Sequence, residues 1–108
     1  MKRQTLLCLL VLVCAFPARA TDAPTTISVI QKDQMFSQPV VTLRVGDTIM
    51  WGNADDVDHN IAIQGGAGEI DHGVQKPGRV IKQTFDVAGN YRVICHIHPH
   101  MKKTVIAQ

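Results

Sequence analysis

Short stretches of alternating apolar and polar residues run through the chain from about residue 26 onward. Val41-Thr42-Leu43-Arg44-Val45 is the clearest of them. Alternation with a period of two is typical of half-buried strands. Turn-forming pairs such as Gly46-Asp47 and Pro77-Gly78 separate the stretches. The pattern predicts seven short strands, over residues 27–30, 41–45, 48–51, 59–63, 79–85, 91–95 and 104–107.

No segment shows the 3.6-residue period of an amphipathic helix. After residue 20 the chain contains ten Ile and ten Val but a single Leu, and β-branched side chains favour strands. Many short strands with frequent turns are typical of a β-sandwich or small barrel, so we predict an all-β fold. We expect Phe36, Trp51 and Phe85 in its core. Residues 35–39 and 69–72 are expected to be irregular.

Residues 1–20 have the pattern of a secretory signal peptide. Lys2 and Arg3 precede an uncharged apolar run over residues 6–16, and Ala18-Arg19-Ala20 resembles a cleavage site. The apolar run is shorter than the roughly 20 residues that span a bilayer. We therefore predict export to the periplasm, no stable membrane anchor, and a single mature domain over residues 21–108.

Removing that segment changes the composition. The predicted mature domain has 88 residues, a net charge of −1 instead of +2, and one Cys instead of three. The near-zero charge argues against a nucleic-acid partner. One Cys cannot form an internal disulfide, so the domain is not a disulfide scaffold. A lone thiol in an oxidising compartment is either buried or used chemically.

The last fifteen residues hold the candidate chemistry. Cys95, His98 and Met101 follow one another at intervals of three, with Pro99 stiffening the turn between them. Thiolate, imidazole and thioether are ligands for borderline and soft metals. The spacing predicts that these three side chains return to one side of a loop after a strand ends.

A fourth ligand has to come from elsewhere, and His59 at the start of a predicted strand is the best candidate. Two His, one Cys and a distant axial Met is the ligand set of blue-copper electron-transfer sites. Zinc-finger spacing is absent, and haem attachment would need a second nearby Cys. A Cys–His nucleophile is formally possible, but nothing in so short a domain suggests a substrate pocket.

Four segments of the sequence resemble the cupredoxin family, in particular its small amicyanin- and plastocyanin-like members. They are residues 45–51 before the first ligand, residues 58–61 around it, residues 88–91 at the turn into the Cys strand, and the ligand loop itself. The loop reads Cys95-x-x-His98-Pro99-x-Met101, with the short amicyanin-type spacing. The resemblance covers nearly all of residues 26–107.

This resemblance implies a Greek-key β-sandwich or barrel of about seven to eight strands that holds one type 1 copper ion. By position, His59, Cys95 and His98 would be the equatorial ligands and Met101 the axial one. Asn60 would tie the two ligand segments together and hydrogen-bond near the thiolate.

The implied function is to shuttle single electrons between exported redox proteins, of cytochrome or dehydrogenase type, by Cu(II)/Cu(I) cycling. Such a protein would be a monomer. It would not be an enzyme, because the chain is too short for the second copper site of the related copper enzymes. The alternative is a copper delivery or storage protein. It is motivated by His96 and His100, which could form an accessory metal site or a copper-loading path.

Two charged segments flank these residues. Residues 55–58 form the only charge run of the domain, and we expect a solvated loop there. Lys102 and Lys103 directly follow the ligand loop, where exposure would let them contact a partner. They would then steer an acidic partner or act as an ordinary polar strand edge.

Overall fold

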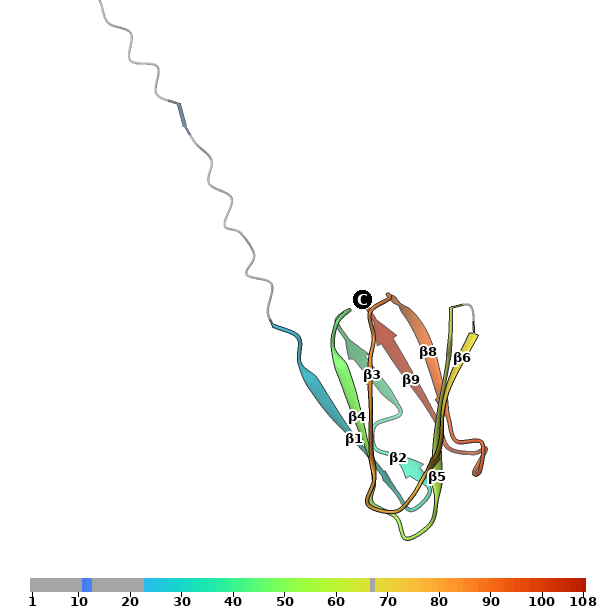
Figure 1. Cartoon of the computed structure of the whole chain (residues 1–108). Coiled ribbons are helices and arrows are strands. Elements are labelled where there is room, and N and C mark those ends of the chain that lie inside the picture. The colour runs from blue at the N-terminus through green and yellow to red at the C-terminus, as the bar shows by residue number, and fades with distance from the viewer. Residues whose placement is uncertain (1–10, 13–22, 67) are drawn as a thin grey trace, which may run out of the picture.

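The computed structural model of the chain describes residues 11–12, 23–66 and 68–108. The predicted signal peptide lies almost entirely outside these residues and stays a prediction. Over the described residues the chain forms nine strands and no helix (Figure 1). The strands are β1 Thr26–Lys32, β2 Met35–Phe36, β3 Val40–Leu43, β4 Thr48–Asn53, β5 His59–Gly65, β6 Gly68–Gln75, β7 Val80–Thr84, β8 Gly89–Ile94 and β9 Lys102–Ala107. Within the described residues, no helix is long and apolar enough to cross a membrane.

The strands form two facing sheets, which confirms the predicted all-β sandwich (Figure 1). One sheet has the order β2-β1-β4-β7 and the other the order β3-β9-β8-β5-β6. β1 pairs with β4 in parallel, and β3 pairs with β9 in parallel, whereas the other pairs are antiparallel. All seven predicted strand segments are present, with end points shifted by a few residues.

The core between the sheets contains the three predicted aromatic residues, Phe36, Trp51 and Phe85. Trp51 is fully buried, and its ring centroid lies 6.2 Å from that of Phe85. The Phe85 ring in turn meets Tyr91 at 5.0 Å, edge to face. Burying apolar surface is the main source of stability in so small a domain. These ring contacts run from Trp51 on β4 in one sheet to Tyr91 on β8 in the other, so they pack the two sheets against each other.

Two of the nine strands were not predicted. Residues 35–36, which were expected to be irregular, form the short strand β2. β6 was missed because its sequence does not look like a strand. Most of its residues are exposed on both faces, so no apolar and polar alternation marks it. β6 is the edge strand of its sheet and pairs only with β5, with a register shift between Asn60 and Ala62. It places Glu69 and Asp71, which we expected in a loop, on a strand beside the one that begins with His59.

Gly65, at the end of β5, lies against the ring of Tyr91. A Cβ at this position would contact Cδ1 of that ring and would lie 2.9 Å from Cε1. Gly65→Ala should therefore push the ring aside and weaken the hydrogen bond from Tyr91 Oη to the Val87 carbonyl, now 2.6 Å. We expect a loss of about 1–3 kcal/mol of unfolding free energy, the range for overpacked sites. Urea denaturation measures it.

Gly68→Ala is the matched control for this variant, because a Cβ there meets nothing within 4 Å. Equal stability of the two alanine variants would show that the Tyr91 ring adapts freely and that the close approach does not matter.

Candidate metal centre

His59 is the first residue of β5 and is fully buried. Its Nε2 lies 2.6 Å from Oδ2 of Asp55. Its other ring nitrogen, Nδ1, is buried and has no hydrogen-bond partner among the described residues. A carboxylate at Nε2 favours the tautomer with the proton there, which leaves a lone pair on Nδ1. A buried lone pair without a partner is costly unless something binds it. His59 therefore has Nδ1 free to bind a metal ion.

Asp55 is held in place by backbone amides, which corrects the prediction that it lies in a solvated loop. Its carboxylate accepts hydrogen bonds from Asp33 N at 2.7 Å and from Gln34 N at 3.0 Å. Both donors lie in the β1–β2 turn and have positive φ angles, 53° and 54°. Burial raises the pKa of the Asp55 carboxyl, but these amides and His59 outweigh it, so the pKa is lowered overall. Asp55 thus joins the β1–β2 turn to the imidazole of His59.

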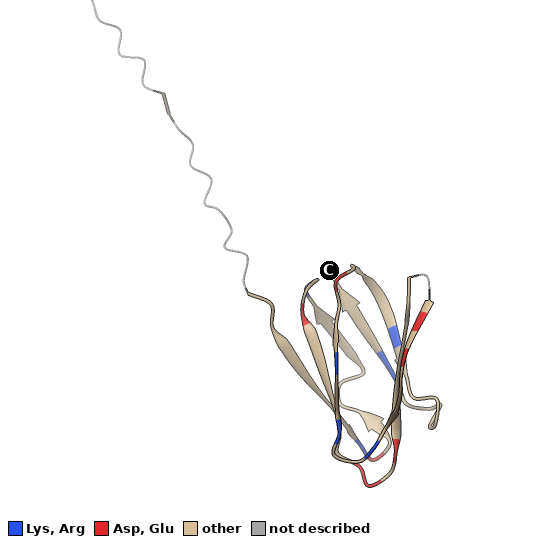
Figure 2. Ribbon diagram, viewed as in Figure 1, with Lys and Arg blue, Asp and Glu red and all other residues tan. Residues whose placement is uncertain are grey.

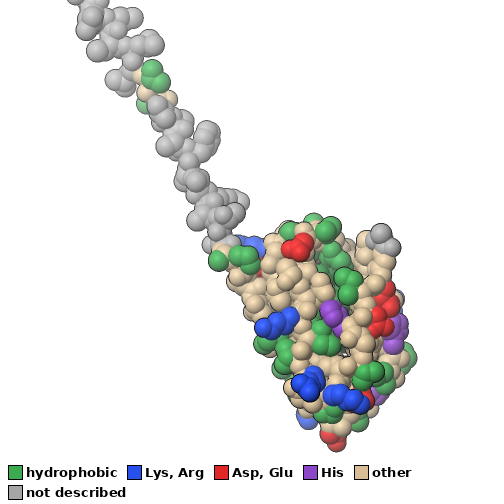
Figure 3. Space-filling view, in the orientation of Figure 1, with side chains coloured by type: hydrophobic (Ala, Val, Ile, Leu, Met, Phe, Trp, Pro, Cys, Tyr) green, Lys and Arg blue, Asp and Glu red, His purple; other side chains and the backbone are tan. Residues whose placement is uncertain are grey.

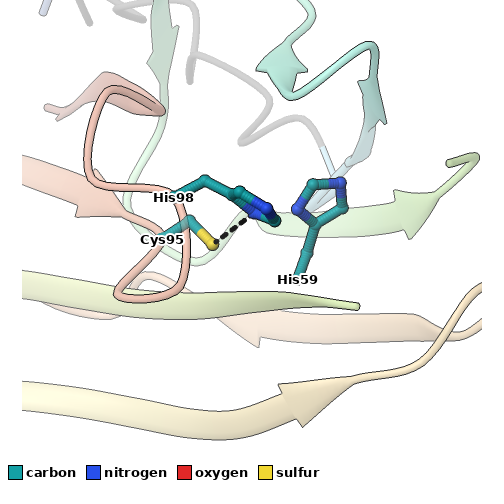
Figure 4. Close-up of side chains that lie close together, drawn as sticks. All are labelled: His59, Cys95 and His98. Atoms are coloured by element: carbon teal, nitrogen blue, oxygen red, sulfur yellow. Dashed lines mark hydrogen bonds between the residues drawn. The ribbon is translucent and has the colours of Figure 1, made fainter. Parts of the chain in front are cut away.

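Cys95, His98 and Met101 lie on the loop between β8 and β9 (Figure 4). Cys95 follows the last residue of β8 and is fully buried, and Met101 is 1% exposed. The loop is closed by backbone hydrogen bonds from Cys95 N to Met101 O, 3.2 Å, and from Met101 N to His98 O, 2.9 Å. Cys95 Sγ lies 3.9 Å from His98 Nδ1. The loop therefore brings the Cys95 sulfur and the His98 nitrogen together within one short segment.

The side chains of His59, Cys95 and His98 converge on one point from β5 and the β8–β9 loop (Figure 4). One donor atom from each lies within 4.8 Å of the others, and the two imidazole rings meet edge to face at 5.1 Å. His98 is partly exposed, whereas the other two are buried. One thiol and two imidazoles with a buried Met on the same loop form a donor set that suits copper. The residues present fit that metal.

Asn60 connects β5 to both of its neighbours through its side chain. Its Oδ1 accepts a hydrogen bond from His96 N at 3.0 Å, directly after Cys95. Its Nδ2 donates to Asp71 Oδ1 at 2.7 Å and to Gly73 O at 2.8 Å. Asn60 thereby ties the segment of His59 to the segment of Cys95, as the family resemblance implies.

The two extra histidines lie in different surroundings. His96 Nε2 lies 3.0 Å from Glu69 Oε1 on β6. The ring of His100 instead meets that of His98 at 6.2 Å. Within the part of the chain that the structure describes, His100 does not belong to the group formed by His59, Cys95 and His98.

Lys103 is buried, so it does not meet the condition of exposure on which partner steering by the two lysines depends. Its Nζ donates hydrogen bonds to the carbonyl oxygens of Ser37 and Gln38. Burial lowers the pKa of Lys103 to about 8. Only Lys102 remains on the surface, which leaves a single lysine next to the loop for contact with a partner.

Comparison with known proteins gives one consistent result. Residues 24–108 match the family described as copper binding proteins, plastocyanin/azurin family. Amicyanin from Paracoccus versutus is 31% identical over 96 residues, which cover 85% of this chain and 73% of the relative. Methylamine utilization protein MauL from Methylorubrum extorquens is 31% identical over 86 residues, covering 79% and 72%.

Solved structures agree with the sequence relatives. A Cu(I) structure of an amicyanin variant matches with a TM-score of 0.72 and 26% identity, covering 77% of this chain and 82% of that one. An oxidised amicyanin variant also matches with a TM-score of 0.72, at 27% identity and the same coverage. The fold, the donor set and the sequence match lead to one conclusion: this chain belongs to the plastocyanin/azurin family of copper-binding proteins.

Proposed function

We propose that the protein is a periplasmic carrier of single electrons whose copper ion is held by His59, Cys95, His98 and Met101. The observation that carries this proposal is the buried convergence of one thiol and two imidazoles, with His59 Nδ1 left without a partner. Copper bound there supplies a Cu(II)/Cu(I) couple that takes up and releases one electron. The chain's own contribution is to hold the donors still.

Rigidity of the donors matters because electron transfer is slowed by any rearrangement that accompanies it. His59 is fixed by Asp55 through its side chain and by the pairing of its backbone with Gln75 of β6. Cys95 and Met101 are linked by their backbone hydrogen bond and are buried. Cu(II) and Cu(I) prefer different geometries, so a frame that moves little between them keeps the rearrangement small. The partly exposed His98 gives the electron a route to the surface.

The visible and EPR spectra of the copper-loaded protein test this proposal. We expect one tightly held copper per chain, an intense thiolate-to-copper absorption in the oxidised state, and reversible loss of the colour on reduction. A copper-loaded protein that is colourless in every oxidation state would contradict electron transfer through a Cys95-bound site.

Copper delivery is the second candidate, and the environment of His96 bears on it. A delivery site needs exchangeable ligands beside the bound ion, but His96 is paired with Glu69 on β6. The buried positions of His59, Cys95 and Met101 also oppose rapid exchange. We therefore favour the carrier. Transfer of copper to a competing chelator within seconds would instead favour delivery.

Met101→Leu should raise the reduction potential while the visible absorption band remains. A thioether is a weak axial donor that stabilises Cu(II) more than Cu(I), and leucine keeps most of the volume without the sulfur. Cyclic voltammetry of the copper-loaded variant measures the change. Met35→Leu is the control, since Met35 is 64% exposed on β2. An equal potential in both variants would remove Met101 from the ligand set.

The partner is proposed to be another exported redox protein, of dehydrogenase or cytochrome type. The likeness to amicyanins and to a protein named for methylamine utilization supports a dehydrogenase as the electron donor. On this proposal the chain is a monomer that catalyses no reaction itself. Reduction of the oxidised protein by a candidate dehydrogenase, followed at its visible band, tests the pairing.

A further inference from the structure

We infer that Glu69, Asp71 and His96 form a second metal site, for a divalent transition-metal ion such as Zn²⁺. It lies on the outer face of the five-stranded sheet, at its β5–β6 edge. One oxygen from each carboxylate and one imidazole nitrogen lie within 4.8 Å of one another. Nothing in the proposed electron-transfer function uses these three side chains together.

The fold places these residues, although they are far apart in the sequence. Glu69 and Asp71 are two positions apart on β6, so their side chains leave the strand on the same face. His96 reaches them across β5, where the small Ala62 lies between Asp71 and Ile94 in the pairing. Acidic residues mark this part of β6 in Figure 2, and acidic and histidine side chains meet there in Figure 3.

The three donors are already held near the positions that an ion needs. Glu69 Oε2 accepts a hydrogen bond from Gln64 at 2.8 Å, and Asp71 Oδ1 accepts from Asn60 and from Gly73 N. His96 and Glu69 have side chains 47% and 33% exposed, so a hydrated ion can reach them. An ion that binds here takes the place of the contact between His96 Nε2 and Glu69 Oε1, which now lie 3.0 Å apart.

The donor types decide which ions fit. Calcium and magnesium prefer a shell made only of oxygen. Imidazole suits Zn²⁺, Cu²⁺ and Ni²⁺, and zinc sites commonly combine histidine with carboxylates. Three protein ligands leave further positions for water. The site is therefore suited to Zn²⁺ or a similar borderline ion and not to an alkaline-earth ion.

This second site is linked to the proposed copper ligands through Asn60. The Asn60 side chain donates to Asp71 and accepts from His96 N, the amide that follows Cys95. An added positive charge opposes the more positive oxidation state of a nearby copper. If copper is held as proposed, zinc at the second site should raise the reduction potential, an effect that rests on the proposed function.

Equilibrium dialysis of the copper-loaded protein against ZnCl₂, followed by elemental analysis, tests the site. We expect one zinc per chain with the copper content unchanged. Glu69→Gln and His96→Gln should each weaken zinc binding more than about tenfold, the lower end of what the loss of even an outer-shell partner costs a metal site. Asp86→Asn, which removes an exposed carboxylate elsewhere on the surface, is the matched control and should bind as the wild type does.

Three outcomes would overturn the inference: no zinc retained, equal weakening in the Asp86 control, or zinc uptake matched by loss of copper. The last would place zinc among the copper ligands. Because zinc retention is counted by element, the test stands even if the protein proves not to be an electron carrier. Zinc retained at one per chain with an unchanged potential would overturn only the link through Asn60.

Discussion

Cys95→Ser should abolish the intense visible band of the copper-loaded protein. That band requires charge transfer from a thiolate, and Cys95 is the only cysteine among residues 21–108. Its sulfur is fully buried and lies 3.9 Å from His98 Nδ1, in the middle of the cluster. Serine is close to cysteine in size but is a hard oxygen donor that stays protonated at neutral pH. The absorption spectrum after copper loading measures the effect.

Two observations make this result interpretable. The far-ultraviolet circular dichroism of Cys95→Ser should match that of the wild type, which shows that the sandwich has formed. His72→Gln removes a histidine whose Nε2 contacts Gln83, away from the cluster, and it should leave the band intact. A visible band that survives in Cys95→Ser would mean that the colour does not come from this thiolate.

Asp55→Asn should weaken copper binding about 10- to 100-fold, the range seen when the outer partner of a ligating histidine is lost. The carboxylate accepts from His59 Nε2 at 2.6 Å and fixes the ring with Nδ1 toward the cluster. An amide carries no charge, and one of its two ends is a donor, so it cannot accept from the imidazole and from both turn amides. Competition against a copper chelator of known affinity measures the loss.

Asp56→Asn is the matched control, since it removes the same charge from the neighbouring, exposed residue. Its copper affinity should remain close to that of the wild type. Equal losses in the two variants would show that general electrostatics, and not the contact with His59, governs binding.

The Asp55 carboxylate also makes the copper-free protein sensitive to acid. Its pKa in the folded state is lowered below the ordinary 3.8, so folding is favoured by the ionised form. This contribution is fully present above the unfolded-state pKa and is lost as the pH falls through the folded-state pKa. The wild type should therefore lose stability below about pH 4 more steeply than Asp55→Asn does, as thermal unfolding across that range would show.

The alternating pattern of the sequence was sufficient to predict seven of the nine strands. Trp51 and Ile49 lie on one such strand, and both are fully buried, as their period-two spacing predicts. β6 was not predicted because it is an exposed edge strand without a buried face, so its apolar and polar residues do not alternate. Its strand character comes from pairing with β5, a contact that local sequence does not encode.

The residues of the candidate site also divide into those whose position follows from local sequence and those whose position depends on distant segments. Spacing alone indicated that Cys95, His98 and Met101 share a loop, because their proximity is local. The contact of Asp55 with the β1–β2 turn and the burial of Lys103 under Ser37 and Gln38 depend on distant segments. A charged side chain is expected on the surface unless such partners are known, so sequence reasoning assigned Asp55 to solvent and did not show that Lys103 is buried.

The closed loop from Cys95 to Met101 also bears on the order in which the site forms during folding. Closing a short loop costs less chain entropy than joining distant segments, and loops of this size close within about 10–100 ns. His59 joins the loop only through the pairing of β5 with β8, and β6 and β7 lie between these two strands in the sequence. We therefore expect the three proposed loop ligands to come together before His59, so that metal present during refolding would bind the loop first.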